Sequence, residues 1–137
     1  MVDIVKLADE VAKKLSDLAK AEVMFAPELE LKGLKELRLI VVPTTIVMKP
    51  IARTTSEDTF KIQVGVLKKC TEDDVNDLIK TVILIGRRFL DVRLGGATCV
   101  EVGYDPLYSA DHLRERRQFT GIVELTFKAV SRNGNEG

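Results

Sequence analysis

Residues 60–90 read FKIQVGVLKKCTEDDVNDLIKTVILIGRRFL, a strand pattern that runs directly into a helix pattern. Every second residue from Phe60 to Val66 is apolar, which is typical of a β-strand with one buried face. From Thr71 to Leu90 the apolar residues instead recur at helical spacing. Thr71 and the acidic residues behind it predict the helix start, because they suit the cap and the positive end of the helix dipole. The stretch therefore predicts a long helix beside an antiparallel sheet.

The segments around this stretch predict further antiparallel strands. The clearest alternation runs from Phe119 to Lys128. Other strands are expected at residues 28–32, 37–42, 46–53 and 98–103, with a polar hairpin connection at residues 54–59. Proline cannot donate to a strand ladder, so Pro43 and Pro50 are expected at strand ends, bulges or a sheet edge. Residues 23–69 therefore predict a meander of three or four strands.

A second helix and a long connection complete the expected fold. Residues 3–20 predict an amphipathic helix with Asp3 as its N-cap, and residues 104–118 predict a polar connection. Residues 131–137 contain no apolar side chain and are predicted to form a disordered tail. The fold class is thus α+β, with residues 1–130 as a single domain. It is expected to be a two-layer sandwich of a mainly antiparallel sheet packed against two main helices.

Charge and composition limit the classes of function. The 137 residues hold 21 Lys and Arg against 21 Asp and Glu, and the resulting net charge of zero argues against a DNA-coating protein or a polybasic membrane binder. The hydrophobic content of 45% is that of a folded globule. The apolar runs are too short to cross a bilayer, and the acidic start does not match a signal peptide, so we expect a cytoplasmic protein with no membrane partner.

The residues that usually carry catalysis are scarce. Cys70 and Cys99 lie far apart in the sequence, and with the single His112 they do not match a metal-binding spacing, so we expect two reduced, half-buried thiols. The Gly95-Gly96 pair leads into a strand rather than a helix, which favours a turn over a phosphate loop. We therefore predict no catalytic, cofactor-binding or metal-binding residues, no cofactor and no enzymatic activity.

Surplus apolar and basic residues instead indicate contact surfaces. Ile83 and Leu84 widen the apolar stripe of the second helix beyond what one sheet covers. Arginines near the end of that helix also suit its dipole, and those in the 104–118 connection suit a solvated face, a subunit salt bridge or nucleic acid. The aromatic residues of that connection are anchors of its own packing or of an interface. The candidate interface residues are Ile83, Leu84, Arg87, Arg88, Leu107, Tyr108, Arg114, Arg116 and Arg117.

Several segments carry a resemblance to a known group of proteins. These are residues 105–109 (DPLYS), 112–115 (HLRE) and 118–121 (QFTG) before the last strand, and residues 62–66 (IQVGV) before the helix with the acidic cap. Together with the order of helix, strands, helix and strands, the chain resembles the tail terminator or tail-completion (neck) proteins of long-tailed bacteriophages and prophages. The resemblance covers most of the chain as a pattern, and no residue-level site is carried over from it.

The resemblance implies a structural role. Such proteins form a homo-oligomeric ring, commonly of six subunits, that terminates the tail tube and joins the tail to the head connector. The implied partners are other copies of the chain, the tail-tube protein, a head connector or completion protein and, transiently, passing DNA. The implied location is the host cytoplasm during assembly and then the virion tail or neck. The alternatives are a head-completion or connector adaptor protein and a small-molecule-binding domain, which would need a pocket with convergent polar groups.

Overall fold

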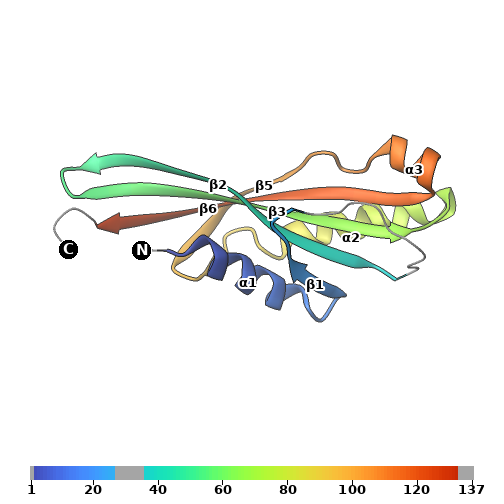
Figure 1. Ribbon diagram of the computed structural model, residues 1–137, viewed down its shortest axis with the longest axis horizontal. Helices are drawn as coiled ribbons and strands as arrows, with labels where there is room; N and C mark the ends of the chain where they lie inside the picture. Colours follow the sequence, from blue (N-terminus) through green and yellow to red (C-terminus); the bar gives the residue numbers. More distant parts are fainter. Residues whose placement is uncertain (1, 27–35, 133–137) are drawn as a thin grey trace.

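The computed structural model describes residues 2–26 and 36–132 and confirms an α+β fold. In these ranges a curled six-stranded sheet, in the order β1-β2-β3-β6-β5-β4, carries three α-helices rather than two (Figure 1). The sheet is mixed, because β1 runs parallel to β2 while the other neighbours are antiparallel. The elements are α1 (Ile4–Leu15), β1 (Lys20–Val23), β2 (Arg38–Ala52), β3 (Thr55–Lys69), the 3-10 turn η1 (Glu72–Asp74), α2 (Val75–Arg87), β4 (Arg93–Leu94), β5 (Ala97–Tyr104), α3 (Ala110–Arg116) and β6 (Gln118–Arg132).

The main core lies between the sheet and the two longer helices. α1 packs mainly on β1 and β2, and α2 packs mainly on β6 and β5. Their buried apolar residues join one core cluster with alternate residues of β3 and β6, which include Phe60 and Phe127. The third helix, α3, lies on the other side of β6 from α2 (Figure 1). It contacts Thr120, whose side chain alternates with the core residue Phe119. The helices therefore do not form one layer, and the expected two-layer sandwich with two helices is not confirmed.

The first helix starts where the sequence predicts. The carboxylate of Asp3 accepts a hydrogen bond from the backbone N–H of Val5 at 2.9 Å, which confirms the predicted N-cap. The helix ends at Leu15 rather than at Lys20. The predicted end is wrong because Lys20–Val23 form β1, whose backbone pairs with Arg38–Val41 of β2.

The second predicted helix is shorter than residues 71–90. It consists of η1 followed by α2, and the Asp74 carboxylate accepts a hydrogen bond from the Thr71 N–H at 3.3 Å at its start. α2 ends at Arg87. Beyond it, Asp91 takes a positive φ of 66° and donates its amide hydrogen to the Cys99 carbonyl at 2.8 Å. This turn leads the chain into β4 and β5.

The 104–118 connection contains α3, which the sequence analysis missed. The Ser109 hydroxyl accepts a hydrogen bond from the His112 N–H at 3.2 Å and caps the helix. Only Leu113 among residues 110–116 is a large apolar residue. A helix this short has no apolar stripe for a periodicity argument to detect, which is why it was not predicted.

The strands are longer than the alternation predicts. The predicted hairpin connection exists between β2 and β3, but its predicted bounds of 54–59 are wrong: the turn is formed by Arg53 and Thr54, and Thr55–Thr59 belong to β3. The register shifts beside Pro43 and Pro50 confirm that both prolines lie at irregularities of the ladder. Ser131 and Arg132 continue β6, so the prediction of a disordered tail is wrong for those two residues. The strand predicted at residues 28–32 and the tail residues 133–137 lie outside the described ranges.

Candidate interaction surfaces

An arm built from the ends of three strands projects beyond the helices (Figure 1). We define the arm as residues 44–61 of the β2–β3 hairpin together with residues 128–132 of β6, which pair with Thr55–Thr59. β1 pairs only with residues 38–41 of β2, so the outer edge of β2 along the arm has no neighbouring strand among the described residues. The arm thus offers both a strand edge and two sheet faces.

Apolar side chains are exposed along this arm. Ile46 and Met48 pair with Phe60 and Asp58, so they lie on the face that continues the core, whereas Val47 lies on the opposite face. All three are exposed, and Ile51 near the tip is 57% exposed. The sequence analysis missed these residues because an apolar run in a strand is the ordinary signal of burial. Their exposure is decided by the helices, since α1 reaches only the base of the arm.

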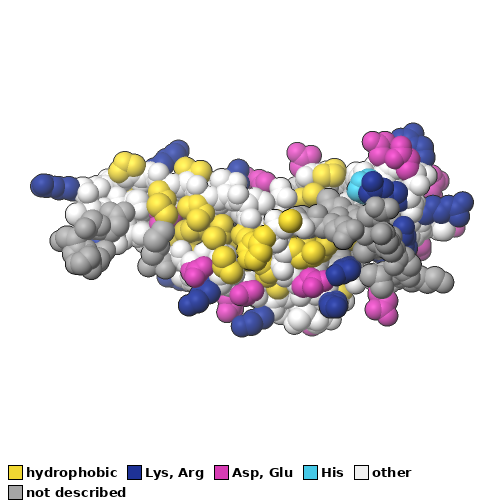
Figure 2. All heavy atoms as spheres, viewed as in Figure 1, with side chains coloured by type: hydrophobic (Ala, Val, Ile, Leu, Met, Phe, Trp, Pro, Cys, Tyr) yellow, Lys and Arg dark blue, Asp and Glu magenta, His cyan; other side chains and the backbone are white. Residues whose placement is uncertain are grey.

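A shallow groove of about 270 Å³ lies at the base of the arm. It runs between the start of α1, at Ile4 and Val5, and Pro43–Ile46 of β2, and it is also lined by Phe25. Phe25 is 70% exposed. Figure 2 shows hydrophobic side chains gathered in a band on this face of the molecule. Contiguous exposed apolar surface of this kind is a candidate for contact with another macromolecule.

A buried carboxylate holds the arm together. Asp58 on β3 is completely buried and accepts hydrogen bonds from the hydroxyls of Ser56, at 2.7 Å, and of Ser131 on β6. Both carboxylate oxygens therefore have a donor, as a buried charge requires. The second bond joins β3 to β6 at the far end of the arm, so the arm is held as a three-stranded sheet.

Some of the predicted interface residues on α2 are exposed, and the others are half-buried or bound within their own chain. Leu84 is 54% exposed and Arg87 is exposed. Ile83 is half-buried, and its carbonyl accepts a hydrogen bond from the Tyr104 hydroxyl at 2.9 Å. Arg88 binds its own chain: it donates to the Asp17 carboxylate at 2.6 Å and to the Lys14 carbonyl at 3.0 Å. Leu84 and Arg87 are therefore the members of this set that are open to a partner.

The Arg88–Asp17 pair connects the ends of two helices. Asp17 follows α1, and Arg88 follows α2. The hydrogen bond and the positive charge of Arg88 lower the pKa of the Asp17 carboxyl, against the opposing effect of desolvation. This pair is a structural tie between the two helices rather than a contact for a partner.

The predicted residues of the 104–118 segment lie mostly at the surface. Tyr108 stacks on Phe119 with ring centroids 6.4 Å apart and remains 39% exposed, while Leu107 packs against the core. Arg114 forms an ion pair with Asp111 at 2.9 Å on the same helix. Leu107 and Tyr108 therefore lie against the core beside Phe119, whereas Arg114 and Arg116 belong to α3.

A hydrogen-bond network fixes α3 on the sheet. His112 Nδ1 lies 2.7 Å from the Thr120 hydroxyl, and His112 Nε2 lies 3.3 Å from Arg116. Because arginine can only donate, Nε2 is the acceptor, and Nδ1 carries the hydrogen that it donates to Thr120. The buried Gln118 amide also donates to that hydroxyl at 2.8 Å. The one histidine thus has a structural role in this network.

The folded chain adds a lysine to the basic residues of α3. Lys69, at the end of β3, donates to the Arg116 carbonyl at 3.2 Å. Arg117 is exposed and adopts a positive φ of 50°. The C-terminal end of α3 therefore collects cations from two segments that are 47 residues apart in the chain.

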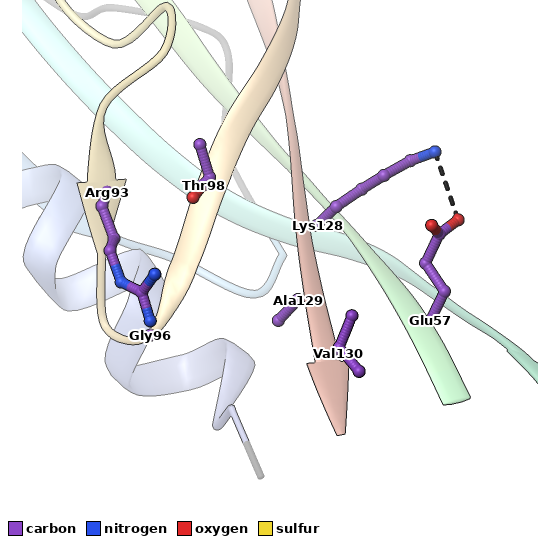
Figure 3. Close-up of a pocket in the computed structure, with 7 residues that line it drawn as sticks. All are labelled: Glu57, Arg93, Gly96, Thr98, Lys128, Ala129 and Val130. Carbon is purple, nitrogen blue, oxygen red and sulfur yellow. Dashed lines mark hydrogen bonds and ion pairs between the residues drawn. The ribbon is translucent and has the colours of Figure 1, made fainter. Parts of the chain in front are cut away.

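A hollow beside the arm is a candidate site for a small molecule. It measures about 330 Å³ and is lined by Arg93, Thr98, Lys128 and Glu57 among others. Figure 3 shows the Lys128 side chain turned towards Glu57, with which it pairs at 3.4 Å, and away from Arg93. The two cations do not converge on one point, as a site for an anionic ligand would require.

The two cysteines are free and fully enclosed. Cys70 and Cys99 are both buried rather than half-buried as expected. Burial is the main cause that raises the pKa of each thiol. In the described part of the chain, no three His, Cys, Asp or Glu side chains are grouped so that they could hold a metal ion.

Neither the hydropathy of the helices nor a comparison of the chain with known proteins assigns a further site. None of the helices in residues 2–26 and 36–132 is both long and apolar enough to span a membrane. No protein-family model and no curated protein matches the chain.

Proposed function

We propose that the protein is a structural subunit of a phage tail, which forms a ring that terminates the tail tube and joins the tail to the head connector. It would be made in the host cytoplasm and retained in the tail or neck of the virion. Its partners would be further copies of the chain, the tail-tube protein and a connector or completion protein. The sequence resemblance motivates this proposal, and the exposed arm is the structural observation that supports it best.

The arm favours an assembly role over catalysis. A subunit that worked alone would leave Met48 and Ile51 in water at a cost of roughly 25 cal/mol for each Å² of apolar surface. Burial of this surface against a neighbouring subunit removes that cost. The open edge of β2 also supplies backbone donors and acceptors that a neighbouring strand can pair with. In the hollow lined by Arg93, Lys128 and Glu57 the polar groups do not converge, so the small-molecule alternative has no comparable support there.

The proposal is tested by tube growth in the presence of the purified protein. Tail-tube protein is polymerised with and without it, and tube lengths are measured by negative-stain electron microscopy. We expect shorter tubes that carry a ring at one end. Unchanged tube lengths would contradict termination, and stable binding to the head connector without any effect on tubes would favour the adaptor alternative.

A variant of the arm connects that activity to the surface described above. Met48→Lys combined with Ile51→Lys should abolish the effect on tubes, because charged side chains on the apolar arm oppose its burial. Val100→Lys is the matched control, since Val100 is an exposed apolar residue of β5 outside the arm. Circular dichroism should be the same for both variants, which separates lost assembly from lost folding.

A further inference from the structure

We infer that the outer edge of β2 along the arm pairs antiparallel with the same edge of a second copy of this chain. The contact joins two arms into one sheet about a two-fold axis at Val47. It goes beyond the proposed function, because it concerns the free protein before it meets a tail, and it does not depend on the ring. Three features of the arm support it: the direction of the backbone groups, the side chains of the edge and the groove at its base.

The direction of the backbone groups of β2 is set at the base of the strand. The Val41 carbonyl accepts a hydrogen bond from the Met24 N–H at 2.9 Å, so the backbone groups of Val41 point towards the β1 side and away from β3. Val41 pairs with Val64 of β3, and in an antiparallel ladder both members of such a pair point away from each other. Val64 therefore points towards β6, as does every second residue of β3.

This alternation identifies the open backbone groups of the arm. Phe60 and Asp58 belong to the set of β3 residues whose backbone groups point towards β6. Their partners on β2 are Ile46 and Met48. Ile46 and Met48 therefore direct their N–H and C=O groups out of the sheet, where no described strand lies beside them.

Two prolines limit the length of this open edge. Pro43 and Pro50 pair with Ile62 and Ser56, which belong to the same alternate set of β3, so both prolines also face outward. Proline has no N–H, and at an outward position its absence costs no hydrogen bond to β3. Between residues 45 and 50 the edge thus offers two N–H donors, flanked by prolines that cannot donate.

A second copy of the same edge satisfies these groups. When two β2 strands run antiparallel with Val47 opposite Val47 of the second copy, Ile46 lies opposite Met48 in both directions. Each of these two pairs exchanges two hydrogen bonds, so four bonds form. Both outward N–H groups of each chain are then used.

The side chains of the edge are compatible with this register. A two-fold axis perpendicular to the sheet leaves each face of the arm on its own side. Ile46 and Met48 meet on the face that continues the core, and Val47 meets its copy on the opposite face. Lys49 lies opposite Thr45, so like charges do not oppose each other. All five residues are exposed in the single chain, and the pairing removes the apolar ones from water.

The same register brings the tip of each arm to the base of the other arm. Counting from Val47, Ile51 of one copy lies opposite Pro43 of the second copy. Pro43 lines the apolar groove of about 270 Å³, together with the exposed Phe25. The paired segment, residues 43–51, is about 30 Å long at about 3.4 Å per residue. One contact therefore covers the exposed apolar residues of the edge, the tip and the groove.

The contact is isologous, because both copies contribute the same surface. Such a contact closes after two copies and does not continue as a filament. It also protects an open strand edge, which is otherwise a template for pairing with other chains. In the proposed function, the arm is then available to a neighbouring subunit only after the dimer opens.

Disulfide formation tests the register. In the inferred pairing the two Val47 residues form a non-hydrogen-bonded pair with Cα atoms about 4.5 Å apart, a separation that a disulfide bridges. We expect Val47→Cys to give a linked dimer, and nothing larger, on a non-reducing denaturing gel after mild oxidation. Val130→Cys is the matched control and should stay monomeric, because this exposed valine lies on the same face but is separated from the edge by β3. The buried Cys70 and Cys99 should form no link in the parent.

Loss of one outward N–H tests the hydrogen bonds. Met48→Pro removes a donor that points out of the sheet and leaves the ladder to β3 intact. Two hydrogen bonds are lost per dimer, so the dimer dissociation constant should rise at least tenfold, as measured by light scattering over a concentration series. Met48→Leu is the control, because it keeps both the N–H and the apolar side chain and should dimerise like the parent. Circular dichroism of the two variants should be the same.

The remaining outcomes separate this contact from other contacts and from the proposed function. A parent that stays monomeric throughout the concentration series overturns the inference. Cross-linking between Val47→Cys and Val130→Cys in a mixture, with neither linked alone, would show a head-to-tail contact and would also overturn it. Cross-linking of Met48→Cys but not of Val47→Cys would overturn the inferred register. A dimer without effect on tube length supports the inference and contradicts the proposed function, and a monomer that shortens tubes does the reverse.

Discussion

Gly86 determines how closely α2 approaches β5. A Cβ atom built at this position lies 2.2 Å from the Tyr104 hydroxyl and 2.7 Å from a methyl carbon of Val102. The same tyrosine donates to the Ile83 carbonyl at 2.9 Å, so the hydroxyl is held in place against the helix. The absence of a side chain at residue 86 is therefore what allows Tyr104 to fix α2 on the sheet.

We expect Gly86→Ala to lower the free energy of unfolding by about 1–3 kcal/mol, because the extra methyl overpacks this contact. Gly103→Ala is the matched control, since a Cβ built there has no neighbour within 4 Å. Urea unfolding followed by circular dichroism measures both variants. Equal stability of the two variants would show that α2 moves away without cost.

At the scale of elements, two ties hold the helices to the rest of the fold. Arg88 connects the end of α2 to Asp17 behind α1, and the His112–Thr120 contact holds α3 on the sheet. Neither tie was predicted, because each joins residues from different elements. The sequence analysis assigned Arg88 to an interface and gave His112 no structural role, because hydropathy periodicity describes only the element in which a residue lies.

The Asp17 tie should make stability depend on pH in the acid range. Its folded pKa lies below the ordinary value of 3.8, so its contribution is present above about pH 4 and is lost as the pH falls through the folded pKa. The parent should therefore lose more stability than Asp17→Asn when chemical unfolding is compared between pH 5 and pH 2. Parallel pH profiles for the two proteins would contradict this assignment.

The α3 tie should respond to loss of the Thr120 hydroxyl. Thr120→Val leaves the His112 and Gln118 donors without their shared acceptor, which should cost about 1–3 kcal/mol. Amide hydrogen exchange should rise within α3 more than in α1. Thr126→Val is the control, because Thr126 is also buried on β6 but pairs with Lys61 and Glu101 of the neighbouring strands, away from α3.

At the scale of the whole molecule, one core encloses both thiols while the tip of the arm remains outside it. Cys70 and Cys99 belong to the core cluster, and burial raises the pKa of each. A raised pKa means less thiolate, which is the reactive form. The two thiols therefore report on opening of the entire fold.

We expect neither cysteine to react with iodoacetamide at pH 8 in the folded protein, and both to react once urea passes the unfolding midpoint. Intact-mass spectrometry after a timed reaction counts the modified thiols. Rapid modification of Cys99 in the folded protein would show that the sheet opens at β5 without global unfolding.

The sequence by itself determined the local features that depend on neighbours along the chain. These include the Asp3 cap, the acidic start before α2, the alternation of β3 and β6, and the irregularities at Pro43 and Pro50. Each follows from backbone geometry or from a period of a few residues. The α+β class follows from them as well.

The tertiary structure alone decided which surfaces are left open. Ile46 and Met48 have the sequence of a buried strand, yet they are exposed because α1 reaches only the base of the arm and no described helix covers the rest of it. Leu84 was predicted to widen the apolar stripe of its helix beyond what one sheet covers, and its exposure agrees with that prediction. Burial is a property of what lies across from a residue, and that partner is set by the packing of distant segments rather than by the local pattern.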